Sequence, residues 1–191
     1  GTTAEKTVTW SIVARDARTG AFGVAVSTKF FAVGALCPHA KSGVGALSTQ
    51  ALINPMYGPN GLALLEQGVS AADAVKRLTQ EDPGSIIRQL HMIDAKGRVA
   101  AHTGTGCIDW CGHKLGEGFS VAGNMLAGPQ VVEKTAEIYV ARADLPFAER
   151  LAAALQAGEA AGGDKRGKQS AALKIHSIED YADVDLRVDD N

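Results

Sequence analysis

The strongest constraint on the fold is a strict two-residue alternation near the start of the chain. In residues 7–14, alternate positions form two sets. One set is mostly hydroxyl-bearing (Thr7, Thr9, Ser11 and Val13), and the other is entirely apolar (Val8, Trp10, Ile12 and Ala14). A period of two places successive side chains on opposite faces of a strand. Residues 21–28 alternate small residues with large ones, after a turn that ends at Gly20. Together the two stretches predict a β-hairpin.

The rest of the chain predicts strands and helices in a regular order. Further strands are expected at 33–37, 42–49, 86–93, 99–102, 119–125, 169–175 and 184–188. Helices are expected from Leu62 after a loop at 54–61, from an N-cap at Ser70, and over 130–143 and 145–157. Short hairpins favour antiparallel sheets. We therefore predict one α+β domain over residues 1–191, a four-layer α-β-β-α sandwich.

Length and charge exclude several classes of protein. The 191 residues carry 19 basic and 21 acidic side chains, a net charge of −2. A chain so close to neutral lacks the basic surface of a nucleic-acid binder. No apolar run approaches the ~20 residues that span a bilayer. We expect a small-molecule substrate or ligand, no nucleic-acid or membrane partner, and a cytoplasmic rather than exported protein, with residues 1–8 as a leader remnant or an addition.

Three cysteines are too few for a disulfide scaffold. Cys107, Cys111 and His113 lie within seven residues, so a metal site has to be considered. A structural zinc site needs a fourth ligand, and the sequence offers no second cysteine pair. We expect no metal and no cofactor. Whether Cys107 and Cys111 form a disulfide stays open.

The position of the hydroxyl residues suggests a nucleophile. The sequence contains no phosphate-binding loop, no Gly-x-Ser-x-Gly elbow and no His-Glu-x-x-His. Thr9 begins the first strand, and Ser11 shares its face. If Thr9 were the first residue, its α-amine, with a pKa of about 8, could serve as the base for its own hydroxyl. The alternative is that both are ordinary polar residues of a strand.

Several further segments carry a resemblance to a known family. They are Thr9-Trp-Ser-Ile-Val-Ala-Arg-Asp16, Gly23-Val-Ala-Val, Gly43-Val-Gly-Ala, Thr49-Gln-Ala, Asn54-Pro-x-Tyr-Gly, Gly123-Asn-Met-Leu, Gly162-Gly-Asp-x-Arg-Gly-x-Gln-Ser170 and Val184-Asp-Leu-Arg-Val-Asp-Asp190. From Thr9 to Asp190 the chain resembles the family called domain of unknown function 1028. That family resembles the N-terminal nucleophile (Ntn) hydrolases, which implies their α-β-β-α sandwich, association into homo-oligomers and a nucleophile at Thr9. Here eight residues precede Thr9, so it would need cleavage after Val8.

Other residues are candidates for the same site. Lys41 or Lys29 could tune the base through its charge, or simply be solvated. Asn54 and Asn124 could donate to an oxyanion, or cap turns. His102 and His113 could act as general bases, or be structural.

The segment 162–170 is the most polar cluster. The candidate substrate-binding residues are Asp164, Arg166, Gln169 and Ser170 of this segment, together with Asn54 and His102. Arginine binds carboxylates with two parallel hydrogen bonds, which would suit a substrate with a carboxylate. The alternative is an ion pair between Asp164 and Arg166 that only orders the loop.

These residues support two hypotheses from different classes. The first is a cofactor-independent Ntn amidohydrolase that acts on a small amide or an acylated amino acid, with Thr9 as nucleophile and Asn124 at the oxyanion. The second is a non-catalytic binding or assembly module with the same sandwich. A hydrolase that uses Ser11, Ser27 or a histidine-assisted group, without an α-amine, is a further possibility.

Overall fold

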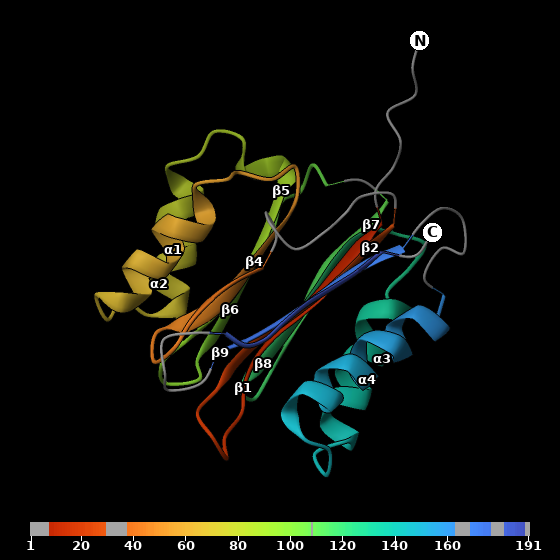
Figure 1. The fold of residues 1–191 in the computed structure, drawn as a ribbon. Coiled ribbons are helices and arrows are strands. Elements are labelled where there is room, and N and C mark those ends of the chain that lie inside the picture. Colours follow the sequence, from red (N-terminus) through yellow and green to blue (C-terminus); the bar gives the residue numbers. More distant parts are fainter. Residues whose placement is uncertain (1–7, 30–37, 108, 163–168, 177–181, 190–191) are drawn as a thin grey trace.

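A computed structural model of the chain describes residues 8–29, 38–107, 109–162, 169–176 and 182–189. Within these ranges the elements form two antiparallel sheets and four α-helices. Helices α1 (Tyr57–Glu66) and α2 (Ala71–Gln80) lie on the outer side of one sheet (Figure 1). Helices α3 (Gln130–Ala141) and α4 (Phe147–Ala160) lie on the outer side of the other. The predicted mixed α+β class is confirmed.

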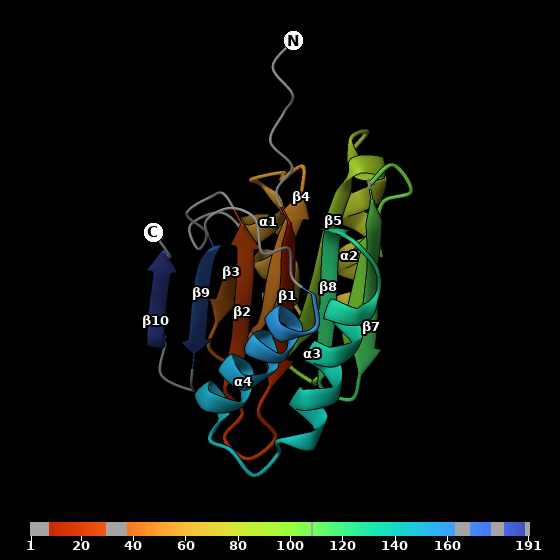
Figure 2. The same ribbon diagram turned by 90° about the vertical axis from the view of Figure 1, so that its right-hand side faces the viewer.

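The larger sheet has, within the described residues, six strands in the order β10-β9-β2-β1-β8-β7 (Figure 2). Their bounds are β1 Thr9–Arg15, β2 Phe22–Lys29, β7 Trp110–Gly116, β8 Phe119–Leu126, β9 Gln169–His176 and β10 Ala182–Asp189. Helices α3 (Gln130–Ala141) and α4 (Phe147–Ala160) pack against this sheet. β1 lies near its centre, between β2 and β8, which protects the strand that carries Thr9 on both sides.

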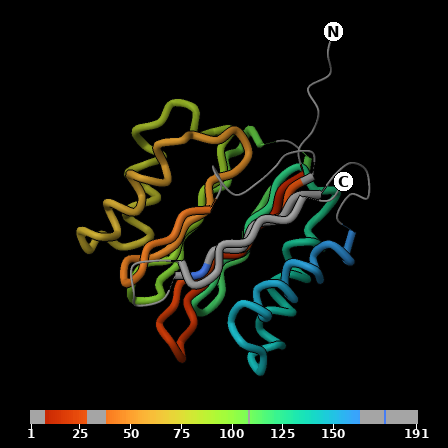
Figure 3. The backbone as a smooth tube through the Cα atoms, in the orientation of Figure 1, coloured from red at the N-terminus to blue at the C-terminus, as the bar shows by residue number. Residues whose placement is uncertain are grey.

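The smaller sheet, in the same described ranges, has the order β3-β4-β5-β6. Its strands are β3 Pro38–Lys41, β4 Gly45–Ala51, β5 Arg88–Asp94 and β6 Val99–Thr103, and its helices are α1 Tyr57–Glu66 and α2 Ala71–Gln80. A short 3-10 turn, η1 (Ser85–Ile87), precedes β5. The tube trace shows the two helix pairs on opposite sides of the stacked sheets (Figure 3).

Three apolar clusters hold the layers together. One lies between the larger sheet and α3 and α4, and a second lies between the smaller sheet and α1 and α2. The third lies between the sheets and consists of Val13, Phe22, Val24, Val26, Ala46 and Ile93. It occupies only part of that interface, because polar side chains fill the rest. The space between the sheets is therefore apolar in one part and polar in another.

Trp10 shows how the helices fix β1. Its indole is fully buried in the cluster below α3 and α4. A Cβ added to Gly158 of α4 would lie 2.7 Å from the indole Nε1, so only glycine allows this close approach. Trp10 and Thr9 point to opposite faces of the strand, as the alternation predicted.

Local signals account for several element ends. Ser70 accepts a hydrogen bond from the Asp73 amide at 3.2 Å and caps α2, as predicted. Gly97 has a φ of +80° in the turn between β5 and β6, where only glycine avoids strain. The strand expected at 33–37 lies outside the described residues.

Three elements differ from the sequence prediction. Strand β3 occupies Pro38–Lys41, between the strands expected at 33–37 and 42–49, and pairs with β4. Helix α1 begins at Tyr57 rather than at Leu62, because Pro59 falls in the first helical turn, where no amide needs a helical acceptor. Strand β7 was not predicted. Its segment contains Gly112, Lys114 and Gly116, and it is held by pairing with β8. None of the described helices has the length and apolar character needed to cross a membrane.

Candidate functional site

A row of polar side chains crosses the end of the larger sheet where β1 begins. Thr9 lies opposite Thr28 of β2 and opposite Asn124 of β8. Directly opposed residues of antiparallel strands share a face. Val13 of β1 packs between the sheets, so Thr9, four residues away, faces the smaller sheet as well. All three polar residues of the row are buried.

The hydroxyl of Thr9 is the start of a short hydrogen-bonded relay. Its Oγ1 lies 2.8 Å from Oγ1 of Thr28. Thr28 Oγ1 donates to the carbonyl oxygen of Val8 at 3.0 Å. Since the single proton of Thr28 goes to that carbonyl, Thr9 must be the donor to Thr28. The relay therefore connects the Thr9 hydroxyl to the carbonyl of the peptide bond that precedes it.

Two residues further along β1, Ser11 enters a second set of contacts between the sheets. Its hydroxyl donates to Gln50 Oε1 of β4 and lies 2.7 Å from His91 Nε2 of β5. The other ring nitrogen, Nδ1, lies 2.8 Å from Ser120 Oγ of β8. Because the Ser11 proton goes to Gln50, Nε2 of His91 carries the hydrogen and donates to Ser11. His91 in this tautomer does not act as a base toward Ser11.

Gln89 connects the same region to Asn124. Its Oε1 accepts from Gln50 Nε2 at 2.8 Å and from Asn124 Nδ2 at 3.1 Å. Its Nε2 faces Thr103 Oγ1 at 2.9 Å and the carbonyls of Gly112 and Gly123, each at 3.0 Å. A single buried amide thus connects β4, β6, β7 and β8. We call Ser11, Gln50, Gln89, His91, Ser120 and Asn124 the inter-sheet network.

Burial keeps the inter-sheet network neutral. Burial, and secondly the charge of His113, lower the pKa of His91 to about 3. The imidazole is therefore neutral at physiological pH, as its hydrogen bonds require. A fully buried, uncharged network of this kind can orient side chains but offers no ready proton exchange with solvent.

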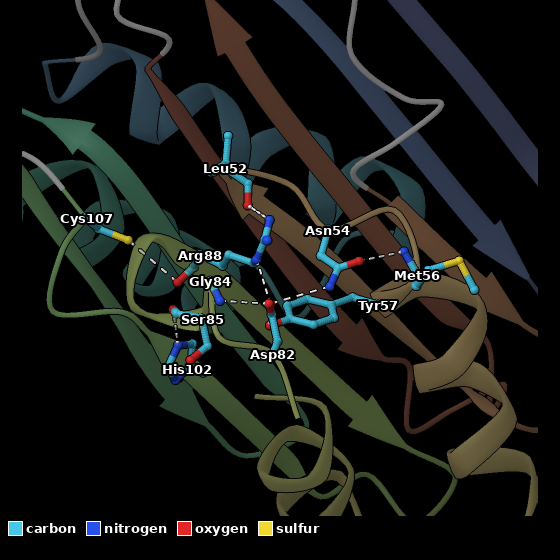
Figure 4. A network of polar contacts seen from close by, with 10 residues as sticks. All are labelled: Leu52, Asn54, Met56, Tyr57, Asp82, Gly84, Ser85, Arg88, His102 and Cys107. Atoms are coloured by element: carbon cyan, nitrogen blue, oxygen red, sulfur yellow. Dashed lines mark hydrogen bonds and ion pairs between the residues drawn. The ribbon is translucent and has the colours of Figure 1, made fainter. Parts of the chain in front are cut away.

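A second, charged set of contacts lies beyond the end of the smaller sheet (Figure 4). Asp82 accepts hydrogen bonds from the Tyr57 hydroxyl, from Asn54 Nδ2 at 3.4 Å and from the Gly84 amide at 2.9 Å. It also forms an ion pair with Arg88, whose Nε lies 2.6 Å from Oδ2. Asn54, Tyr57, Asp82 and Arg88 are here called the Asp82 cluster.

The Asp82 cluster is electrostatically biased toward the ionised aspartate. Burial raises the pKa of Asp82, but the hydrogen bonds from Tyr57, Gly84, Asn54 and Arg88 together outweigh it and lower the pKa. Burial, followed by the hydrogen bond to Asp82 and its charge, raises the pKa of Tyr57. Tyr57 therefore remains a protonated donor and Asp82 an anion at neutral pH.

Large apolar side chains surround the Asp82 cluster. Leu52, Met56 and Ile86 are each more than half exposed, and Ile87 is also exposed. The amide of Leu52 donates to the carbonyl of Ile87 at 3.2 Å, which brings the two segments together. Figure 4 shows Leu52 and Met56 on either side of Asn54. Apolar groups exposed around a buried ion pair are typical of a protein contact surface.

The structure brings three of the four expected catalytic residues together. Thr9, Ser11 and Asn124 share the inner face of the larger sheet. Lys41 lies elsewhere: it pairs with Glu66 of α1 at 2.9 Å. The register of β3 and β4 places it opposite Gly45, five residues and so roughly 16 Å along β4 from Gln50. Lys41 therefore does not reach Thr9.

Two of the expected binding residues belong to the Asp82 cluster or border it. Asn54 donates to Asp82 and also accepts from the Met56 amide, so it both caps a turn and joins the cluster. His102 donates from Nε2 to the Ser85 carbonyl at 2.8 Å. Neither residue lies in the row with Thr9.

The remaining candidates have other positions. Ser27 lies opposite Trp10 and so faces the helices, away from Thr9, and His113 contacts Thr103 at 2.9 Å. Ser170 and Gln169 of β9 lie in register with Thr28 and Lys29. Asp164 and Arg166 lie outside the described residues, so the expected charged clamp stays a prediction.

Sequence reasoning missed Gln50, Gln89, His91 and Ser120. Each is polar and lies at an inner-face position of its strand, and His91 and Ser120 have apolar residues on both sides, as in Leu90-His91-Met92. A polar residue flanked on both sides by apolar ones, within a strand expected to be covered on both faces, was the available signal. The contacts of these four residues could not be predicted, since their partners come from other strands.

No set of three His, Cys, Asp or Glu side chains in the described ranges converges as metal ligands would. His113 instead contacts Thr103, and neither Cys107 nor Cys111 is in a disulfide. The described polar residues thus offer hydroxyl, amide and imidazole chemistry together with one buried carboxylate–guanidinium pair.

Comparison with known proteins places the chain in a family. No curated protein matches the sequence. The crystal structure of protein SPO2555 from Silicibacter pomeroyi, of the DUF1028 family, is similar with a TM-score of 0.89 and 34% sequence identity. The similarity covers 96% of this chain and 79% of that one. Residues 9–191 match the family of unknown function DUF1028. The chain therefore belongs to the DUF1028 family.

Proposed function

We propose that this chain is a cofactor-independent amidohydrolase of the Ntn type, with Thr9 as its nucleophile. The observation that carries the proposal is the relay from the Thr9 hydroxyl through Thr28 to the Val8 carbonyl. An Ntn nucleophile needs a free α-amine, and the Val8–Thr9 bond is the one that has to break. The relay acts on that bond.

The activating step is an intramolecular acyl transfer. Thr9 Oγ1 attacks the Val8 carbonyl carbon, its proton passes to Thr28, and Thr28 passes its own proton to the Val8 oxygen. The carbon–nitrogen bond then breaks, the nitrogen of Thr9 takes up the proton, and an ester remains between Val8 and Thr9. Water hydrolyses this ester, which leaves a Val8 carboxylate, a free Thr9 hydroxyl and a free Thr9 amine.

In the processed enzyme, the Thr9 amine takes the hydroxyl proton as Thr9 attacks a substrate amide. Asn124 lies opposite Thr9, and its amide nitrogen carries two hydrogens. Gln89 accepts one of them, and the other would donate to the oxyanion. A small amide or acylated amino acid is the proposed substrate, with Asp164 and Arg166 as its binding residues.

The layer arrangement supports the same proposal. Two stacked antiparallel sheets with helix pairs outside them are what the resemblance to Ntn hydrolases implies. The inner-face position of Thr9, at the beginning of a central strand, is also consistent with that resemblance. Association into homo-oligomers remains part of the proposal.

The test is cleavage of the chain itself. Intact mass and N-terminal sequencing follow the purified protein during incubation at neutral pH. We expect a product that begins at Thr9, no product from Thr9→Ala, and at least tenfold slower cleavage in Thr28→Val, which keeps the shape of Thr28 but not its hydroxyl.

Thr135→Val is the matched control. Thr135 is a buried threonine whose hydroxyl donates to the Val131 carbonyl within α3 and takes no part in the relay from Thr9 through Thr28 to Val8. Cleavage should continue in this variant at the wild-type rate. A wild-type chain that stays intact under these conditions would contradict the α-amine mechanism.

The second candidate function is a non-catalytic binding or assembly module. It is favoured by the exposed Leu52, Met56 and Ile86 around the Asp82 cluster. A partner that covers these side chains would bury apolar surface next to a preformed ion pair. If the chain is not cleaved, a Leu52→Ser and Ile86→Ser variant that loses partner or self-association would support this alternative.

A further inference from the structure

His113 of β7 is an ionisable residue at the outer end of the inter-sheet network, and the proposed hydrolase mechanism does not use it. It is partly exposed, and its Nδ1 lies 2.9 Å from Thr103 Oγ1 of β6. Thr103 Oγ1 in turn accepts a hydrogen bond from Gln89 Nε2 at 2.9 Å. Gln89 Oε1 accepts from Asn124 Nδ2 at 3.1 Å. A continuous line of hydrogen bonds therefore joins a histidine in contact with solvent to the proposed oxyanion donor.

The direction of these hydrogen bonds follows from the groups that form them. An amide nitrogen only donates, so Thr103 Oγ1 is the acceptor toward Gln89. The one hydroxyl hydrogen of Thr103 is then left to donate to Nδ1 of His113, which requires the neutral imidazole with its hydrogen on Nε2. A hydroxyl that donates to one neighbour becomes a stronger acceptor for another, because hydrogen bonds in a chain polarise one another. Neutral His113 thus strengthens the contact between Thr103 and Gln89.

Gln89 Nε2 has more acceptors than hydrogens. It lies 2.9 Å from Thr103 Oγ1 and 3.0 Å from each of the carbonyl oxygens of Gly112 and Gly123. An amide nitrogen carries two hydrogens, so the three oxygens compete for them. The strength of Thr103 as an acceptor therefore decides how the Gln89 amide is oriented.

Protonation of His113 reverses the outermost hydrogen bond. An imidazolium donates from both ring nitrogens, so Nδ1 then donates to Thr103 Oγ1 and the hydroxyl hydrogen of Thr103 has to turn away. Thr103 Oγ1 becomes a weaker acceptor for Gln89, whose two hydrogens pass to the two carbonyls. Because Oε1 belongs to the same planar amide, the acceptor of Asn124 moves with it.

The surroundings of His113 favour its neutral form. Burial and then the charge of His102 of β6 lower the pKa of His113. His91 of β5 is neutral, and β8 carries no ionisable residue where it pairs with β7. On β7 itself, Cys111 lies two residues before His113, and Lys114 points to the opposite face, where α3 packs. The ring therefore takes up a proton only below its ordinary pKa of about 6.5.

We propose that His113 is a pH-sensitive positioning residue, whose neutral form fixes the amide of Gln89 and, through it, that of Asn124. Thr103 transmits the effect. No proton passes along the line, because neither amide gains or loses one; only the direction of a hydrogen bond changes. The consequence for turnover rests on the proposed amidohydrolase function, whereas the coupling between the side chains does not.

The coupling is measured by NMR titration of the full chain between pH 8 and pH 5. The ring signals of His113 are followed together with the side-chain amide signals of Gln89 and Asn124. We expect both amides to shift with the midpoint of His113. The side-chain amide of Gln67, on the exposed end of α1, is the reference and should not shift with that midpoint. Network amides that stay fixed while His113 titrates, or a His113 that does not titrate in this range, overturn the proposal.

Two variants separate the hydrogen-bonded route from a through-space effect of the charge. Thr103→Val removes the hydroxyl but leaves His113 able to titrate, so the shift of the two network amides should be lost. His113→Gln keeps a hydrogen-bonding side chain without an ionisable ring, and the shift should be lost there as well. Network amides that titrate in Thr103→Val as they do in the wild type overturn the proposal. The wild-type titration is decisive even where a variant does not fold.

In the processed enzyme the same titration should appear in kcat. As His113 takes up a proton, we expect kcat to fall by about tenfold with KM unchanged, because an oxyanion contact exists only in the transition state. His113→Gln should lose this step of the pH profile and keep the step caused by the Thr9 amine. Identical kcat profiles in the two proteins would overturn the positioning role. A chain without hydrolytic activity would contradict the proposed function, and the amide titration would still decide whether His113 positions Asn124.

Discussion

The inter-sheet network and the Asp82 cluster differ in the charge and the burial of their polar groups. The first is neutral, almost fully buried, and made of hydroxyl, amide and imidazole groups from strands of both sheets. The second is charged, lies beyond the end of one sheet and keeps some solvent contact, with the Arg88 side chain 17% exposed. Burying a charge costs far more than burying a paired neutral group. The comparison teaches that, among the side chains that the structure describes, the polar groups buried between the sheets are neutral and paired.

The two regions also differ in how acid affects them. The lowered pKa of Asp82 means that this carboxylate stabilises the fold above its unfolded pKa of about 3.9, and that the contribution is lost as the pH falls through the folded pKa. Acid acts on His91 in the same direction but from a higher pH, because only the unfolded chain binds its proton just below about pH 6.5. The inter-sheet network is therefore the region that weakens first on acidification.

The largest change in stability is expected from the removal of the Gln89 amide. Gln89→Leu removes the acceptor of Asn124 Nδ2, one of the two acceptors of Gln50 Nε2 and a donor to the Gly112 and Gly123 carbonyls. We expect the free energy of unfolding to fall by about 4 kcal/mol. Urea denaturation measures it, with Gln67→Leu on the exposed end of α1 as the control that should change it by less than about 0.5 kcal/mol. A loss equal to that of the control would mean that the network is not tightly coupled.

Breaking the ion pair of the Asp82 cluster should lower the free energy of unfolding somewhat less than Gln89→Leu does. Arg88→Met leaves Asp82 with neutral donors only, and we expect a loss of about 3 kcal/mol in the free energy of unfolding. Arg77→Met, on the exposed side of α2, is the matched control. Adding Asp82→Asn to Arg88→Met should recover part of the loss, since no unpaired charge then remains. No recovery in this double variant would argue against a buried ion pair.

Acid should weaken the inter-sheet network through His91. Its folded pKa of about 3 lies below the unfolded value of about 6.5, so only the unfolded chain binds this proton between those values. Stability should therefore fall by up to about 1.4 kcal/mol per pH unit as the pH drops below 6.5. Denaturation curves at pH 7, 6, 5 and 4 measure it, and His91→Gln should flatten the profile. If stability falls equally steeply with pH in His91→Gln and in the wild type, other groups cause the acid sensitivity.

The smallest expected effect is at the edge of the network. Ser48 donates to Gln50 Oε1 at 3.0 Å, but that oxygen also accepts from Ser11. Ser48→Ala therefore leaves no acceptor unsatisfied, and we expect a loss of about 1 kcal/mol or less. Ser11→Ala, which also removes the acceptor for His91 Nε2, should cost more in the same measurement. Equal losses would mean that His91 does not depend on Ser11.

Much of the fold could be predicted from local pattern. The alternation around Thr9, the cap at Ser70 and the turn at Gly97 depend on nearby residues, and the structure has all three as expected. Strand β7 and the start of α1 could not be predicted in this way. The glycines and lysine of β7 give no strand signal, and its pairing with β8 supplies what the local sequence lacks.

The candidate site shows the same division. Thr9 and Ser11 were found because alternation placed them on one face of one strand, and Asn124 because it ends a predicted strand. Lys41 was expected beside them because charge and order along the chain were the only guides. In the fold it pairs with Glu66 instead. Gln50, Gln89 and His91 gave too weak a signal to be noticed, since their importance depends on what faces them.

The sequence by itself determined which side chains face inward on each strand, because a strand places alternate residues on alternate faces whatever its neighbours are. Only the tertiary structure decided which inward polar groups meet. Ser11 and His91 are 80 residues apart in the chain and 2.7 Å apart in the fold. The stacking of two sheets brings them together, and the cost of burying an unpaired polar group makes each depend on the other.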